Sequence, residues 1–342
     1  MNWPGLLKWS LAHQDGTKKT DIPALSDEQK KWLEEALAST VIDEVKEMKK
    51  LITHIDTLTK DTKVHHQQRD TQIAEAIEDL ISLLQNSDSA INFCKIGGPI
   101  QLYELIVDSH YSPDVRAAGC RMLAEATQNN HYVQDFSSKL EFCRLMKVIQ
   151  EAEGSAPLAQ AAISALSATL KGNNLVNKRI FISENGLGFL LNLLQKNKNE
   201  KVEAKALSIL SDLLYFKSHL SYNILVVHDQ NKIEEIGEDL RIFTHQVEQA
   251  ENHIFEVLSS KIEPILSDHS HKNHFLRYSL VDCFKALLEN QKREKKYIPH
   301  RWMFVITSLR AHCAEMEKLA AKDDFFEVEV SNLNDLFIKT DD

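Results

Sequence analysis

The chain has 342 residues, and its 40 basic and 50 acidic side chains give a formal net charge of −10. An acidic chain lacks the basic stripe that neutralises phosphates, which argues against a nucleic-acid partner. Hydrophobic residues make up 43% of the chain, enough for a core, whereas 10 Gly and 7 Pro are too few for the many turns of an all-β fold. The composition therefore favours an all-α protein.

Cysteine usage and the N-terminus bear on the compartment. The five cysteines are an odd number without a Cys-x-x-Cys spacing, as is usual in reducing compartments. Residues 1–12 have no basic start before their short apolar stretch, so they do not resemble a secretory signal. No run reaches the roughly 18 apolar residues that span a bilayer. We expect a cytoplasmic monomer without a membrane partner, with the nucleus as the alternative compartment.

The first 25 residues divide into an apolar cluster and a polar stretch. The cluster contains Leu6, Leu7, Trp9 and Leu11. Residues 14–25 are polar and include Gly and Pro, as in flexible linkers. We therefore expect residues 1–25 to form a flexible N-terminal segment.

Helices are predicted between residues 26 and 85. Ser26 and Gln29 have the spacing of a capping box, which places a helix start near Asp27. Two apolar stripes with helical spacing follow, and their residues are Val41, Val45, Met48, Ile52 and Ile55, then Ile73, Ile77, Leu80, Ile81 and Leu84. The first stripe is too short for a free-standing coiled coil, so we expect it to dock on neighbouring helices.

One spacing recurs three times between residues 86 and 220. A phenylalanine precedes a leucine by nine residues in each copy, and the pairs are Phe93 with Leu102, Phe136 with Leu145, and Phe181 with Leu190. The copies are 43 and 45 residues apart. Helical repeats of this length are typical of solenoids, in which each unit buries its apolar face against its neighbours.

A second pattern has the same period. Helical stripes of apolar or small residues begin at Val115, Leu158 and Val202, with members at offsets 0, 3, 4, 7, 8 and 11. Lys205 is the single exception to these stripes. Each stripe predicts a long helix that buries one face.

Each copy reads as a short helix followed by two longer ones. Gly97-Gly98 and Asn185-Gly186 end the first helix of the first and third copies, because glycine adopts a left-handed conformation at low cost. Ser112-Pro113-Asp114 and Ser155-Ala156-Pro157 introduce two of the third helices. This pattern predicts a right-handed armadillo solenoid over residues 86–220, with two-helix HEAT units as the alternative.

The repeat is weaker towards the C-terminus. Leu276, Leu280 and Phe284 keep a helical spacing, so residues 221–322 are interpreted as degenerate helical repeats. Residues 323–342 carry seven carboxylates and one lysine, and we expect this acidic tail to fray.

The third helices contain the candidate binding residues. Offsets 2, 6, 9 and 13 lie opposite each apolar stripe, and most of them are small or weakly polar instead of Lys or Glu. Such a face admits a partner closely, although crowding between neighbouring third helices explains it equally well. The predicted contact residues are Arg121, Gln128, Gln160, Ser164, Ser167, Lys171, Ser208, Ser211 and Tyr215.

Motifs for catalysis are missing from the sequence. His269, His271 and His274 could be imagined as metal ligands, but no Cys or fixed carboxylate completes a set of four, and a polar turn between helices explains them. Gly97-Gly98 lacks the further glycines and the lysine of a phosphate-binding loop. We therefore expect no enzyme activity, no metal and no cofactor.

Three motifs point to a family. They are Leu-Leu-Lys-Trp-Ser-Leu-Ala at 6–12, Asn-Phe-Cys-Lys-Ile-Gly-Gly at 92–98, and Val-Arg-Ala-Ala at 115–118 followed by Gln-Asn-Asn at 128–130. With these motifs the chain resembles the armadillo-type nucleotide exchange factors of cytosolic seventy-kilodalton heat-shock chaperones (heat shock protein 70). The resemblance covers residues 88–215 and the N-terminal motif, whereas residues 220–342 match weakly.

The resemblance implies a co-chaperone that binds no nucleotide itself. Its concave face would hold one lobe of the chaperone's nucleotide-binding domain and displace the other, so that ADP escapes. The N-terminal segment, through Leu6, Leu7, Trp9 and Leu11, would enter the peptide groove and assist client release; folding back on the solenoid is the alternative. An armadillo adaptor for extended peptides is the second interpretation, although Trp is absent from all three third helices.

Overall fold

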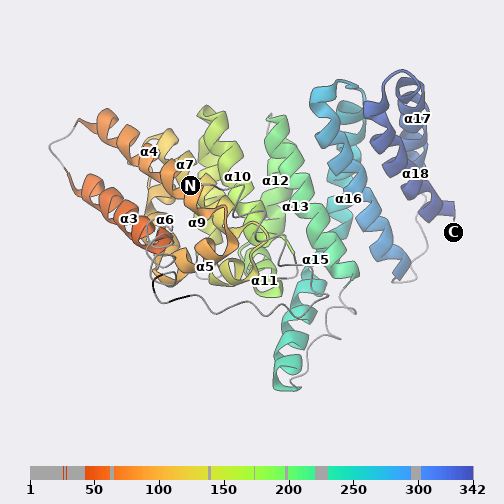
Figure 1. The fold of residues 1–342 in the computed structure, drawn as a ribbon. Helices are drawn as coiled ribbons and strands as arrows, with labels where there is room; N and C mark the ends of the chain where they lie inside the picture. The colour runs from red at the N-terminus through yellow and green to blue at the C-terminus, as the bar shows by residue number, and fades with distance from the viewer. Residues whose placement is uncertain are drawn as a thin grey trace. The chain divides into compact units, whose positions relative to one another are not determined.

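The computed structural model describes residues 43–61, 65–137, 140–172, 174–196, 199–219, 230–293 and 302–341, together with Ser26 and Glu28. All regular secondary structure in these ranges is helical, which confirms the predicted all-α class (Figure 1). Residues 1–25 and the helix start near Asp27 lie outside the described residues. The chain from Val45 onward forms one compact unit, and the repeats belong to it.

Two helices precede the repeats. They are α3 (Glu44–Lys60) and α4 (His66–Leu84). Met48 and Ile55 of α3 and Ile73 and Ile77 of α4 are buried in one core cluster with the first repeat, so the expected docking of the first stripe is confirmed. Helix α4 packs along a third helix, α7 (Pro113–Thr127).

Three units of three helices follow, in the armadillo order of one short helix and two longer ones. The first unit contains α5 (Ser87–Lys95), α6 (Gly98–Val107) and α7. The second contains α8 (His131–Ser137), α9 (Phe142–Glu151) and α10 (Ala156–Leu170), with a short 3-10 turn, Ala152–Gly154, before α10. The third contains α11 (Leu175–Ser183), α12 (Gly186–Lys196) and α13 (Glu200–Ser218).

The predicted stripes form the core of these units. All positions of the stripes in α7 and α10 are buried, and in α13 all are buried except Lys205, which is half-buried. Phe93 and Phe181 are fully buried, whereas Phe136 is only partly so. Third helices pack against one another in chain order, α7 on α10, α10 on α13, and α13 on α16 (His274–Arg293) (Figure 1).

An asparagine starts each first helix of the three units. Asn86, Asn130 and Asn174 are 44 residues apart, and each side-chain oxygen accepts a backbone N–H of the helix it starts. Two of them also contact the preceding unit, since Asn130 Nδ2 donates to the Ser87 carbonyl at 3.1 Å and Asn174 Nδ2 donates to Asp135 at 2.8 Å. These asparagines therefore set both the start of a helix and its register on its neighbour.

The predicted breaks between first and second helices use left-handed backbone. Gly97 has φ of 78° before α6, and Asn185 has φ of 63° before α12. Asparagine tolerates this conformation better than other non-glycine residues, which explains the substitution in the third unit.

Pairs of longer helices complete the chain. They are α15 (Gln230–Leu266) with α16, and α17 (Trp302–Ala320) with α18 (Glu327–Asp341), accompanied by 3-10 turns at His271–Asn273 and Asp324–Phe326. Within the described ranges, no helix combines the length and the apolar composition that a membrane span requires.

The prediction of a fraying acidic tail is wrong. Helix α18 packs on α16 and α17, and it buries Leu333, Leu336 and Glu329. The count of carboxylates was misleading because one of them, Glu329, is buried against Arg277 and supports the packing instead of opposing it. The side chains beyond residue 337 lie outside the described part.

Candidate protein-binding surface

The nine predicted contact residues differ in exposure. We call the exposed and half-buried side chains of α7, α10 and α13 that lie opposite the core the third-helix surface. Of the nine residues, Arg121, Gln128 and Lys171 are exposed, Gln160, Ser164, Ser208 and Tyr215 are half-buried, and Ser167 and Ser211 are buried.

Two of these predictions need correction. Ser167 and Ser211 are each only 2% exposed, so neither belongs to the surface. Ser211 donates to Asp282 of α16, which covers it from the neighbouring repeat. Crowding between third helices, the alternative explanation for small residues, therefore accounts for these two positions.

Arg121 is tied to the adjacent helix. Its Nε donates to Glu78 Oε1 of α4 at 3.0 Å, and both side chains are about half exposed. Exposed ion pairs of this kind contribute roughly 0–1 kcal/mol, so the pair gives little resistance to an exchange of partners.

Tyr215 is fixed at the far end of the same surface. Its hydroxyl donates to Asp282 Oδ1 at 3.1 Å, and burial followed by the charge of Asp282 raises the pKa of Tyr215. The tyrosine therefore remains a protonated donor, with its half-buried ring on the surface.

A buried lysine of α11 contacts α13. Lys178 of α11 is fully buried, and its Nζ donates to the Leu170 carbonyl at 2.6 Å and to Asp212. The same Nζ lies 5.1 Å from the ring centre of Phe216. Burial lowers the pKa of Lys178, and the charge of Asp212 opposes this effect. Asp212 is therefore neutralised from within the protein.

Lys205 is the functional candidate that the sequence analysis did not select. It is half-buried on α13, at a stripe position that is alanine in the other two units, Ala118 and Ala161. Burial, and then the nearby charge of Lys171, lowers the pKa of Lys205. Neither lysine forms a salt bridge with a described carboxylate. The interruption of the stripe was the signal that could have identified it.

An acidic groove lies between α4 and the start of α7. It has a volume of about 980 Å³. Its acidic lining comes from Asp70, Glu75, Glu78, Asp79 and Asp114. The Asp70 carboxylate already has a partner within the protein, because it accepts the Ser112 N–H at 3.0 Å. The exposed carboxylates of α4 give the groove its negative charge.

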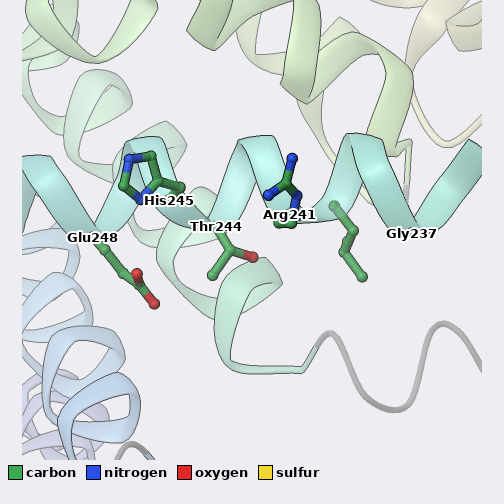
Figure 2. A pocket seen from close by; sticks show the side chains of 6 residues that line it. Gly237, Arg241, Thr244, His245 and Glu248 are labelled. Carbon is green, nitrogen blue, oxygen red and sulfur yellow. The ribbon is translucent and has the colours of Figure 1, made fainter.

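A smaller hollow lies along one helix, α15 (Figure 2). It has a volume of about 390 Å³, and its described lining consists of Gly237, Leu240, Arg241, Thr244, His245 and Glu248 of α15. Arg241 is paired with Glu238 in its own helix. Side chains from successive turns of one helix do not converge on a ligand, so this hollow is not the candidate site.

One of the three histidines first considered as metal ligands, His274, contacts a carboxylate, that of Glu329. Glu329 accepts from Arg277 Nε at 2.7 Å, lies 2.9 Å from His312 Nε2 and lies 3.2 Å from His274 Nδ1. The His269 ring contacts the ring of His312, while the His271 side chain is not described. In the described part of the chain, no three His, Cys, Asp or Glu side chains are placed to hold a metal ion.

Comparison with known proteins leaves the function open. No family model matches the chain, and no curated protein matches it. Among solved structures, the chain is similar to the crystal structure of an engineered protein, with 12% identity, a TM-score of 0.49, and coverage of 86% of this chain and 98% of the other. The function is therefore inferred from the residues themselves.

Proposed function

We propose that the chain is a co-chaperone that promotes ADP release from a cytoplasmic seventy-kilodalton heat-shock chaperone. The observation that carries the proposal is the third-helix surface with its short, half-buried side chains at Ser164 and Ser208, together with Lys205, which is half-buried on the same helix as Ser208 and has no described carboxylate partner. The motifs at 92–98 and 115–118, on which the family resemblance rests, belong to the same repeats.

The surface suits a folded partner more than a small molecule. Short side chains on α10 and α13 let a partner's backbone approach closely, and a desolvated cation gains most from a carboxylate supplied from outside. Such a contact promotes nucleotide release if it is available only when the chaperone's domain is open. By linkage, nucleotide must then weaken the complex by the same factor.

The test is a binding measurement with and without nucleotide. Calorimetric titration of the chaperone's nucleotide-binding domain into the full chain should give tight binding without nucleotide and weaker binding with ADP or ATP. Equal affinity in all three conditions would remove the basis for exchange, and no binding would remove the proposal. A nucleotide titration of the chain alone serves as the control.

The N-terminal segment has a separate role in this proposal. Leu6, Leu7, Trp9 and Leu11 supply apolar side chains that a peptide groove can bind, and they lie outside the described residues. A tether to a bound clamp raises the local concentration of such a segment near the groove. The segment would therefore assist client release without contributing to the clamp.

The acidic groove favours a second candidate function, an adaptor for extended basic peptides. Glu75, Glu78 and Asp79 line one wall and attract Lys and Arg side chains. Fluorescence anisotropy with a labelled Lys/Arg-rich peptide and an acidic peptide of equal length tests this function. Binding of the basic peptide that persists in the presence of the chaperone domain would identify an independent site.

A further inference from the structure

Several carboxylates that bridge neighbouring helices in this chain contact a cation. Examples are Glu78 with Arg121, Asp212 with Lys178, Glu203 with Lys261, Glu251 with Lys217, and Glu329 with Arg277. Asp282 of α16 also bridges two helices, but it does so through the hydroxyls of Ser211 and Tyr215. Among the described residues it forms no salt bridge with Arg, Lys or His.

The negative charge of Asp282 is therefore not neutralised from within the described chain. Two hydroxyl donors satisfy part of its hydrogen-bonding capacity but leave its full charge. Asp282 is half-buried, so water screens the charge only in part. A carboxylate in this setting gains more from a cation than a fully exposed one does.

Two tyrosines flank this carboxylate. Tyr215 reaches it from α13, and Tyr278 lies one turn earlier on α16, on the same face as Asp282. Both rings are half-buried and thus partly on the surface. The faces of aromatic rings attract cations, and arginine in particular combines ring stacking with paired hydrogen bonds to a carboxylate.

Other carboxylates act on the two tyrosines, and the described cations near Asp282 on α16 contact other groups. Glu289 acts on Tyr215, and Asp335 acts on Tyr278, in addition to Asp282. Lys285 of α16 is directed to α18, where its Nζ donates to Asn332 at 2.7 Å and lies 3.6 Å from Asp335, whose charge it offsets in part. His274, one turn before Tyr278, is engaged with Glu329.

We propose that Asp282, Tyr215 and Tyr278 form a receptor for one arginine side chain of a bound partner protein. The receptor extends the third-helix surface from α13 onto α16, in the region where the family resemblance is weak. The inference rests on the proposed function for the identity of that partner, the heat-shock chaperone, but not for the chemistry of the site.

The first experiment replaces the charge and keeps the shape. Asp282→Asn retains an acceptor for the hydroxyls of Ser211 and Tyr215, so the fold and melting temperature should be preserved. Its affinity for the chaperone's nucleotide-binding domain should fall roughly tenfold, and the loss should shrink at high salt. The matched control is Glu263→Gln, which removes one charge from an exposed position of α15 and should leave the affinity unchanged. Equal affinity of D282N and E263Q would overturn the proposal.

Tyrosine variants separate the ring from the hydroxyl. Tyr215→Phe keeps the ring and should weaken binding about twofold, whereas Tyr278→Ala removes one wall and should weaken it by roughly fivefold. A twofold or smaller effect of Y278A, together with a normal melting temperature, would contradict the part given to Tyr278.

The second experiment does not require the chaperone. Isotope-labelled full-length protein is titrated with a short peptide that contains one arginine, and in parallel with the same peptide that carries citrulline, its neutral isostere. Arginine-specific shifts of the signals of Tyr215, Tyr278 and Asp282, absent in D282N, would support the site. Equal shifts with citrulline, or none, would overturn it. If the wild-type chain binds no chaperone, the proposed function fails and this titration alone decides the receptor.

Discussion

The ring of Phe181 occupies the space beside Gly186 in which any other residue would carry its Cβ. A Cβ on Gly186 would lie 2.5 Å from two ring carbons, and one on Gly98 would lie 2.0 Å from a ring carbon of Phe93. The two pairs hold the same place in the first and third units, and both rings are fully buried. Each Phe–Gly pair therefore fixes how a second helix leaves the first.

Gly186→Ala should destabilise the protein because the added methyl group collides with the buried ring and with the backbone carbonyl of Phe181. Overpacking of this kind costs about 1–3 kcal/mol, and urea unfolding followed by circular dichroism measures it. Gly154→Ala is the matched control, since a Cβ there meets nothing within 4 Å. Equal midpoints for G186A and G154A would show that the ring moves aside at no cost.

Lys205→Ala should separate stability from binding. Alanine occupies this stripe position in the other two units, and a half-buried lysine without a described partner is desolvated without compensation. The variant should therefore unfold at the same or a higher urea concentration, while its affinity for the chaperone domain falls at least fivefold. Lys196→Ala, at an exposed position of α12, is the control and should change neither. Loss of stability in K205A would indicate a structural role for the lysine.

The stability that α18 gains from its packing should fall at low pH, where Glu329 becomes protonated. Burial raises the pKa of Glu329, but hydrogen bonds from His312 and Arg277 lower it more strongly, to about 2 from an ordinary value of 4.5. Because the folded pKa is depressed, the stabilisation is complete above about pH 4.5 and is lost as the pH falls towards 2. The shift corresponds to about 3 kcal/mol.

Glu329→Gln provides the comparison for this pH dependence. The variant leaves Arg277 buried without its charged partner, so it should be clearly less stable than the wild type at pH 6. The difference between the two proteins should shrink between pH 4.5 and pH 2.5 in urea titrations. A difference that stays constant over this range would show that Glu329 is not the titrating group.

Deletion of residues 1–13 should leave ADP exchange intact and slow client release, because the proposed function assigns the apolar side chains of this segment to the peptide groove and not to the clamp. Each of these side chains contributes roughly 1.5–3 kcal/mol when buried, before ordering costs, so the contact should be weak and competable. Release of a labelled peptide is measured beside ADP release for both proteins. Equal loss of both activities would place the segment in the clamp, and loss of neither would make it inert.

Periodicity predicted the core of the three armadillo units, because the residues on the buried face of a helix recur every three or four positions. The stripes beginning at Val115, Leu158 and Val202 are buried almost without exception. The asparagine caps were missed, although Asn86, Asn130 and Asn174 have the same period. A pattern of apolar residues gives no signal for polar side chains that bond between repeats.

Surface positions were harder to predict than core positions. Offsets along one helix could not show that α16 covers Ser211 or that Glu78 pairs with Arg121, since both contacts join residues from different repeats. The same limitation made the C-terminal segment look like a tail, because Glu329 is stabilised by residues 52 and 17 positions earlier, Arg277 and His312.

The most direct test of the proposed function is the rate of ADP release from the chaperone. Stopped-flow dissociation of a fluorescent ADP analogue should accelerate with increasing full-length protein and reach a plateau. Ser164→Glu combined with Ser208→Glu places charge at two half-buried positions of the third-helix surface, and it should reduce the acceleration while leaving the helical circular dichroism and the melting temperature nearly unchanged. No acceleration by the wild-type protein at saturating concentration would contradict the proposed function.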